Sequence, residues 1–161
     1  MKRGLGTQLR HLLELLDGAV QASYADAGLT YRPRYTPVMR VLEEREFASI
    51  GEIAEAAGIT QPAVTQTVAL MVRDGLVHSR PARHDARVRV VRLARKGRDL
   101  LPALRTCWRV TEAAAHTLDG EMTTPLSQAL AEAIVCLEAH SFGERLAKAR
   151  SALYVETVNA D

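Results

Sequence analysis

The side chains of this chain that could do chemistry are concentrated between residues 61 and 109, and most of them are cations. Eleven basic residues and three aspartates between Arg73 and Arg109 give this stretch a net charge of +8, whereas the rest of the chain sums to −6. A basic block on an otherwise acidic chain indicates a surface that meets a polyanion. Arg80, Arg83 and His84 are the members that we expect to contact phosphate oxygens, since charge alone serves there.

A second group of polar side chains comes just before this block and could bond to the edges of bases. Gln66 has the amide that bonds adenine N6 and N7 together, and the methyl group of Thr65 can pack on thymine. Gln61 stands near the start of the same segment, where free backbone N–H groups favour a phosphate. At helical spacing, one exposed face carries Pro62, Thr65, Gln66, Ala69 and Arg73.

Two short helices joined by a glycine turn must position these residues. Ser49 and Glu52 have the spacing of a capping box, and apolar residues from Ile50 to Ala57 recur at helical spacing. Gly58 supplies the positive φ that ends such a helix. Thr60 is an N-cap candidate for the second helix, whose buried stripe would be Val64, Val68 and Met71. This arrangement predicts a helix-turn-helix.

A pair of strands follows the two helices. Residues 76–80 and 88–93 are rich in β-branched residues and read as short strands. They flank residues 81–87, a turn that is too basic to be buried. A helix-turn-helix followed by such a hairpin is a winged helix.

At this point the chain resembles the MarR (multiple antibiotic resistance regulator) family of transcription factors. The residues that carry the resemblance are Gly75-Leu76-Val77, Arg80, Asp85-Ala86-Arg87, Leu93 and Lys96-Gly97. Ala94 stands where the family usually has threonine. The resemblance implies that Arg87 at the wing tip enters the minor groove of DNA and that Asp85 orients it. It also implies a homodimer, a repressor of transcription and a short strand at Phe47-Ala48 beside the wing.

Helical patterns occupy the rest of the chain. We expect a first helix from Leu5 to about Ala27, and a second from an N-cap at Thr36 to about Glu44. After the hairpin, a helix should run from Lys96 to about Leu118, with Pro102 in its first turn or at a kink. Asp119-Gly120 should break the chain, and one long helix should run from Thr124-Pro125 to Arg150, roughly 40 Å at 1.5 Å per residue.

The expected fold is therefore mainly α with a small β-wing. We assign residues 1–33 to an N-terminal dimerisation helix and linker, 34–95 to the winged helix-turn-helix, and 96–161 to C-terminal dimerisation helices. Both terminal parts carry apolar seams, among them Leu5, Leu9, Leu12 and Leu16 in the first helix. A single compact helical cap is the alternative to a dimer.

The resemblance also implies an effector site, because many members of the family bind small aromatic acids or other lipophilic anions between the dimer helices and the winged domain. The residues that could line such a crevice by position are His11, Leu15, Tyr35, Met39, Arg40 and Trp108. Ordinary core and interface packing would explain the same residues.

Other function classes find little support. The chain has no GxSxG, HExxH or phosphate-binding glycine loop, and its five histidines are scattered, so we expect neither an enzyme nor a metal or other cofactor. Cys107 and Cys136 lack CxxC spacing, which is typical of a reduced cytoplasmic protein. Two alternatives stay open: a winged helix that binds proteins, and a regulator that senses oxidants through a cysteine.

Overall fold

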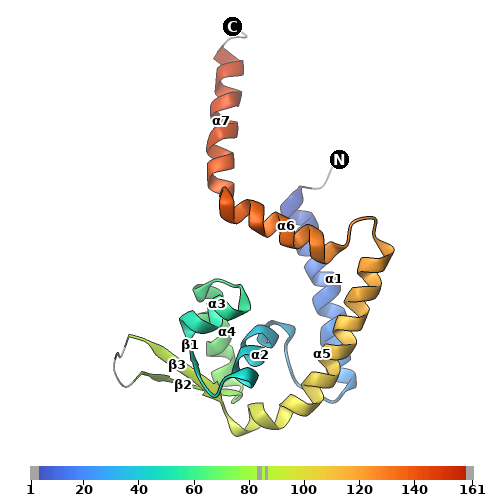
Figure 1. The fold of residues 1–161 in the computed structure, drawn as a ribbon, viewed down its shortest axis with the longest axis vertical. Helices are drawn as coiled ribbons and strands as arrows, with labels where there is room; N and C mark the ends of the chain where they lie inside the picture. Colours follow the sequence, from blue (N-terminus) through green and yellow to red (C-terminus); the bar gives the residue numbers. More distant parts are fainter. Residues whose placement is uncertain (1–3, 83–84, 86, 159–161) are drawn as a thin grey trace. The chain divides into compact units, whose positions relative to one another are not determined.

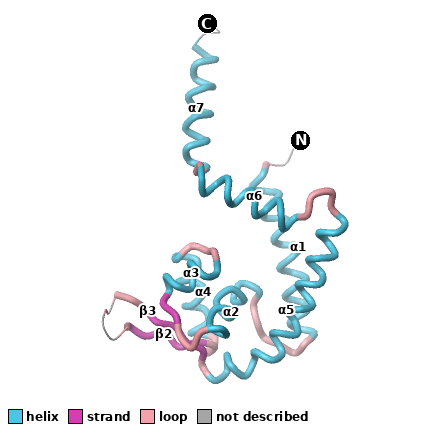
Figure 2. The backbone as a smooth tube through the Cα atoms, viewed as in Figure 1, coloured by secondary structure: helices cyan, strands magenta, loops and turns pink. Residues whose placement is uncertain are grey.

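The computed structural model describes residues 4–82, 85 and 87–158 and divides the chain into two compact units, Met1–Thr111 and Glu112–Asp161. The fold class is confirmed: the described chain is mostly helical and contains one small antiparallel sheet (Figures 1 and 2). The elements of the first unit up to the sheet are α1 (Leu5–Asp26), η1 (Pro33–Tyr35), α2 (Thr36–Glu44), β1 (Ala48–Ser49), α3 (Ile50–Ala57), α4 (Gln61–Arg73), β2 (Val77–Pro81) and β3 (Arg89–Leu93).

The helix-turn-helix forms where local capping chemistry predicted it. The Ser49 hydroxyl accepts the Glu52 N–H, and the Glu52 carboxylate accepts the Ser49 N–H. These two hydrogen bonds complete the capping box at the start of α3. Gly58 ends α3 at a φ of 64°, in the left-handed region that favours glycine. The Thr60 hydroxyl then accepts the Ala63 N–H and starts α4. These three local signals fix both ends of α3 and the start of α4.

The sheet has the strand order β1-β3-β2, and both pairs are antiparallel. β1 includes Ala48 but not Phe47, whose side chain is exposed, so the expected short strand is shifted by one residue. β2 and β3 extend outward from the helices (Figure 1). One face of the sheet packs on α2, α3 and α4, and the core there consists of Val38, Met39, Val41, Leu42, Ile53, Ala54, Val64, Val68, Met71, Leu76, Val77, Val91 and Leu93.

The end of α1 joins this core through a cluster of three tyrosine rings. The rings of Tyr24 and Tyr31 meet edge to face at 4.9 Å between centroids, and those of Tyr31 and Tyr35 at 5.7 Å. Edge-to-face pairs of this kind contribute about 0.5–1.5 kcal/mol beyond the area that they bury. Thr36 is the first residue of α2 rather than its N-cap, and its hydroxyl hydrogen-bonds the Tyr24 hydroxyl instead. The expected cap is therefore wrong.

The C-terminal helices differ most from expectation. α5 (Arg95–Glu121) continues through Asp119 and Gly120, so the predicted break there is wrong. Pro102 lies inside α5, which bends in its first half, as the missing N–H of a proline would cause (Figure 1). Instead of one long helix there are two, α6 (Leu126–Ala139) and α7 (Phe142–Val158).

The division between α6 and α7 has a clear local cause. The Glu144 N–H donates to the Ser141 hydroxyl at 3.2 Å, and the Glu144 carboxylate accepts the Ser141 N–H at 2.7 Å. This reciprocal pair is a second capping box, which starts a new helix at Phe142. Ser141-x-x-Glu144 is the sequence signal that would have predicted it.

The capping box of α3 gives the first testable prediction. Ser49→Ala should cost about 1 kcal/mol of stability near neutral pH, because the Glu52 N–H loses its acceptor.

Hydrogen bonds from Ser49 lower the pKa of Glu52 from its usual 4.5. Ionised Glu52 therefore stabilises the fold fully above that value, and the contribution is lost as pH falls through the lowered pKa. In urea unfolding, the free energy of unfolding of the parent should exceed that of Glu52→Gln near neutral pH, and this difference should disappear in acid. A difference that does not change with pH would contradict the hydrogen bond between the Glu52 carboxylate and Ser49.

Candidate nucleic-acid interface

The exposed face of α4 carries the residues that the sequence predicted for base contacts. Gln61, Pro62, Thr65, Gln66 and Arg73 are all exposed. The opposite face is buried and consists of Val64, Thr67, Val68 and Met71, which anchor the helix in the core. α4 thus presents a surface of small and polar groups with one cation at its C-terminal end.

The hydroxyl of Thr65 is used inside the helix. It donates to the backbone oxygen of Gln61 at 2.9 Å. Because that proton is engaged, the methyl group is what Thr65 has available for an apolar partner. The side chain of Gln66 makes no hydrogen bond among the described residues, so both ends of its amide can meet a ligand.

The tip of the hairpin holds Arg87 in a turn that Asp85 organises. The Asp85 carboxylate accepts the Arg87 backbone N–H at 2.9 Å and lies 3.9 Å from the Arg87 Nε. The Arg87 side chain is 96% exposed, so this ion pair is solvated and worth little energy. Asp85 therefore shapes the turn and leaves the guanidinium able to reach a partner. Arg83 and His84, which we predicted as phosphate contacts, lie outside the described residues.

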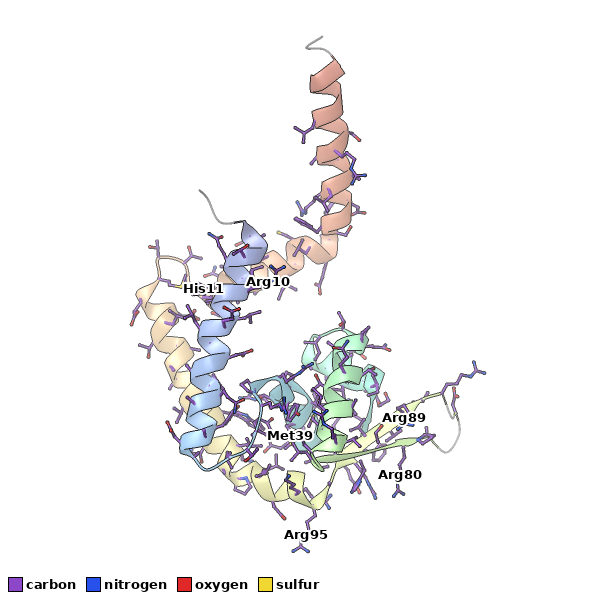
Figure 3. All side chains as sticks on the ribbon, turned by 180° about the vertical axis from the view of Figure 1, so that it is seen from behind. Arg10, His11, Met39, Arg80, Arg89 and Arg95 are labelled. Atoms are coloured by element: carbon purple, nitrogen blue, oxygen red, sulfur yellow. The ribbon has the colours of Figure 1, made fainter. Side chains whose placement is uncertain are left out.

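The strands add cations that we had counted in the basic block but had not assigned to the site. The register pairs Arg80 with Val90 and His78 with Arg92, which places Arg80 and Arg92 on the same, outward face of the sheet. Arg89 instead bonds the hydroxyl and the backbone oxygen of Ser79 across the hairpin. Figure 3 shows Arg80 and Arg89 on the hairpin and Arg95 at the start of α5. The alternation of residues along the strand would have identified Arg92.

The six residues predicted for an effector crevice are placed in three different settings. Tyr35 and Met39 are buried in the core, and His11 and Leu15 are exposed on α1. Trp108 belongs to the same core as Tyr35 and Met39, and the Arg40 guanidinium lies 4.9 Å from the centroid of its indole ring. The indole N–H of Trp108 is buried and has no acceptor among the described residues.

The described residues contain neither a cluster of metal ligands nor a membrane-spanning helix. No group of three or more histidine, cysteine, aspartate or glutamate side chains is arranged to hold a metal ion. None of the described helices is both long and apolar enough to cross a membrane. Cys107 is buried and Cys136 is exposed, and both are free thiols.

Comparison with known proteins adds a family match. Residues 27–88 match the model of the MarR family, and no curated protein matches the chain. Among solved structures, the chain is similar to the M. tuberculosis transcriptional regulator MosR in complex with DNA, with 21% identity and a TM-score of 0.67 over 87% of this chain and 100% of that one.

Two further structures share the fold. A mutant of E. coli MarR complexed with operator DNA is 15% identical, with a TM-score of 0.56 over 84% of this chain and 93% of that one. Bordetella bronchiseptica BpsR, described as regulated in its DNA binding by 6-hydroxynicotinic acid, is 17% identical, with a TM-score of 0.57 over 86% and 94%. The matched residues span the helix-turn-helix and the first strand of the wing, so this part of the chain is similar to the MarR family.

Proposed function

We propose that this chain acts in the cytoplasm as a homodimeric repressor that binds an inverted repeat in double-stranded DNA. The observation that carries the proposal is the exposed face of α4, which presents Thr65 and Gln66 with only one cation, next to a hairpin that presents Arg80, Arg87 and Arg92. Amide and methyl groups suit the major groove, where each base pair has its own pattern of donors and acceptors.

Each predicted contact has a separate role in this proposal. Gln61 and Pro62 approach the DNA backbone at the N-terminus of α4, where the partial positive charge of the helix end favours a phosphate. Arg73 and Arg80, together with Arg83 and His84, neutralise further phosphates. Arg87, held by Asp85, enters the minor groove, whose width and A·T content it would read.

The dimer is supported by apolar side chains that a single chain leaves exposed in both units. In the first unit, Leu5, Leu13 and Leu15 of α1 are each more than half exposed. In the second, Ile134 and Val135 of α6 are too. Surfaces of this kind mark interaction sites in soluble proteins. We assign residues 1–33 and 96–161 to the dimer and residues 34–95 to DNA.

We also propose that a small aromatic or lipophilic anion releases the protein from DNA. Arg40 and Trp108 support a site for it, since a guanidinium over an indole offers an anion both charge and an apolar wall. The Trp108 N–H still lacks an acceptor among the described residues, and a carboxylate could provide one. The remaining predicted members of this crevice are His11, Leu15, Tyr35 and Met39.

Selection of genomic fragments by the purified protein, followed by fluorescence anisotropy, tests DNA binding. We expect an inverted repeat with half-sites about one helical turn apart, roughly 10 bp centre to centre. Affinity should fall steeply with salt, since each neutralised phosphate contributes about −0.9 to the log–log slope. Equal binding to scrambled repeats, or a flat salt response as for a protein-binding module, would refute sequence-specific DNA binding.

Two companion measurements test the finer parts of the proposal. Sedimentation at micromolar concentration should give twice the chain mass of 17.6 kDa. A monomer would contradict the proposal that two subunits bind the two half-sites of an inverted repeat. A reporter gene placed behind the selected site should lose expression when the protein is present. A gain of expression would make the protein an activator.

A further inference from the structure

The two faces of the small sheet differ in their chemistry. The inner face packs on α2, α3 and α4 through the buried side chains of Val77, Val91 and Leu93. The register pairs His78 with Arg92 and Arg80 with Val90. Because side chains alternate along a strand, these four residues lie on the outer face. The outer face of the hairpin therefore carries two arginines and a histidine.

The cations on this side of the molecule are available to a partner. The side chains of His78, Arg80 and Arg92 are exposed and make no hydrogen bond or ion pair among the described residues. Arg95, at the start of α5, lies with Arg80 on the lower side of the ribbon in Figure 3, and its side chain is 92% exposed. Its Nε is 3.7 Å from the Asp99 carboxylate, in a solvated pair that constrains it little. We call His78, Arg80, Arg92 and Arg95 the outer cationic face.

The spacing of the two strand arginines suits a row of phosphates. Arg80 and Arg92 are diagonal neighbours across β2 and β3, roughly 7–8 Å apart. At this separation each guanidinium can take its own phosphate, which its planar fork of donors binds well. An extended polyanion therefore fits this face better than a single small anion does.

The outer cationic face and the exposed face of α4 lie on different sides of the winged-helix core. The sheet contacts that core with its inner face, and α4 buries one side in it while Thr65 and Gln66 point away. A straight duplex along α4 can therefore meet the hairpin near its tip, at Arg87. It would pass by Arg92 and Arg95 at the root of the hairpin.

We propose that the DNA flanking each half-site bends around the hairpin and lies against the outer cationic face, where Arg80, Arg92 and Arg95 neutralise its phosphates. The cations continue from Arg87 at the tip through Arg80 to the root, which favours the same duplex over an unconnected partner. Bending costs elastic energy that the added contacts must offset, and flexible TA and CA steps lower that cost. The proposal rests on the proposed function, because it needs a dimer seated on the inverted repeat.

Fluorescence anisotropy of the full chain on duplexes of two lengths tests the proposal. Both contain the selected inverted repeat, and the longer one carries about 15 bp more on each side, or one and a half helical turns. The parent should bind the longer duplex at least tenfold more tightly and with a steeper dependence on salt. A scrambled repeat with the same flanks corrects for non-specific binding.

Variants of the outer cationic face should lose this dependence on length. Arg92→Ala should bind the short duplex like the parent, lose at least fivefold on the long one, and lower the salt slope there by roughly one per subunit. Arg92→Lys should keep most of the affinity, since phosphate neutralisation needs the charge. Arg95→Ala, which removes an exposed side chain and should fold normally, should also lose part of the gain. Arg109→Ala, an exposed cation further along α5, is the matched control and should behave like the parent.

Energy transfer between dyes at the two ends of the long duplex tests the bend. It should rise when the parent binds, because the ends approach each other, and rise less with Arg92→Ala. Transfer that stays at the value of free DNA would overturn the proposal. Capture of a second, labelled duplex by that unbent complex would then identify separate DNA as the occupant of the face.

The affinities distinguish failure of this proposal from failure of the proposed function. Equal affinity of the parent for the two lengths, or a length dependence that Arg92→Ala and Arg95→Ala leave unchanged, would overturn the role of the outer cationic face. The proposed function would then stand. Binding to neither duplex, or equal binding to the scrambled repeat, would overturn both.

Discussion

Gly97→Ala is expected to destabilise the winged-helix part by about 2–3 kcal/mol, because the added methyl group has no space. A Cβ at this position would lie 2.2 Å from the backbone oxygen of Leu76 and 3.4 Å from a methyl carbon of Leu93. The Leu76 oxygen also accepts the Ala94 N–H at 2.9 Å, so moving it aside would strain the junction between β3 and α5. Urea unfolding should show a lower midpoint with an unchanged slope.

Gly18→Ala is the matched control for this substitution. Gly18 also lies inside a helix, but an added Cβ there meets nothing within 4 Å. Replacing it should leave stability unchanged or raise it by up to about 1 kcal/mol, since alanine is the better helix former. If Gly97→Ala and Gly18→Ala shift the midpoint alike, then α5 does not pack on the Leu76 backbone as described.

The close approach at Gly97 also gives a physical reason for part of the family resemblance. Lys96-Gly97 was one of the motifs that suggested the family, and the sequence offered no reason for the glycine. In the structure, Gly97 lets α5 start against the Leu76 backbone, and Lys96 bonds the Asp74 carbonyl. Both residues act on the segment between α4 and β2, which no local pattern could reveal.

The parts of the fold that the sequence predicted well are those that local chemistry determines. Ser49 with Glu52, Gly58 and Thr60 each act within four residues, so the ends of α3 and the start of α4 followed directly. The same reasoning was wrong at Asp119-Gly120. There Asp119 accepts bonds from Ser127, eight residues on, and the helix continues past both residues.

The parts that could not be predicted depend on residues far apart in the sequence. The bond from Tyr35 to Asp74 spans 39 positions, and that from Lys96 to Asp74 spans 22. Ser79 and Arg89 are closer, yet only the register of β2 and β3 shows that the arginine is tied across the hairpin. Residue types and spacing therefore predicted which face of α4 is buried and which is exposed. They could not predict the hydrogen bonds from Tyr35 and Lys96 to Asp74 that hold the end of the helix.

Substitutions of Arg87 and Gln66 should have different effects on DNA binding, which distinguishes the role of the hairpin from that of α4. Arg87 has its side chain almost fully exposed and Asp85 beside it, as expected of a group that enters the minor groove and reads its width rather than single bases. Arg87→Ala should therefore weaken all sites, lower the salt slope by roughly one per subunit, and leave the selected consensus unchanged.

Gln66→Ala should instead alter sequence preference at one position in each half-site. The amide of Gln66 lies on the exposed face of α4, and removing it should cost about 1–3 kcal/mol on the best sequence and little on the worst. Arg10→Ala, on α1 and outside both elements, is the matched control and should bind like the parent.

Selection and anisotropy on all three variants, after each is shown to dimerise and melt like the parent, decide between the two roles. A uniform loss of affinity for Gln66→Ala together with a new consensus for Arg87→Ala would mean that the two elements exchange roles. The hairpin would then contact the bases, and α4 would contact only the DNA backbone.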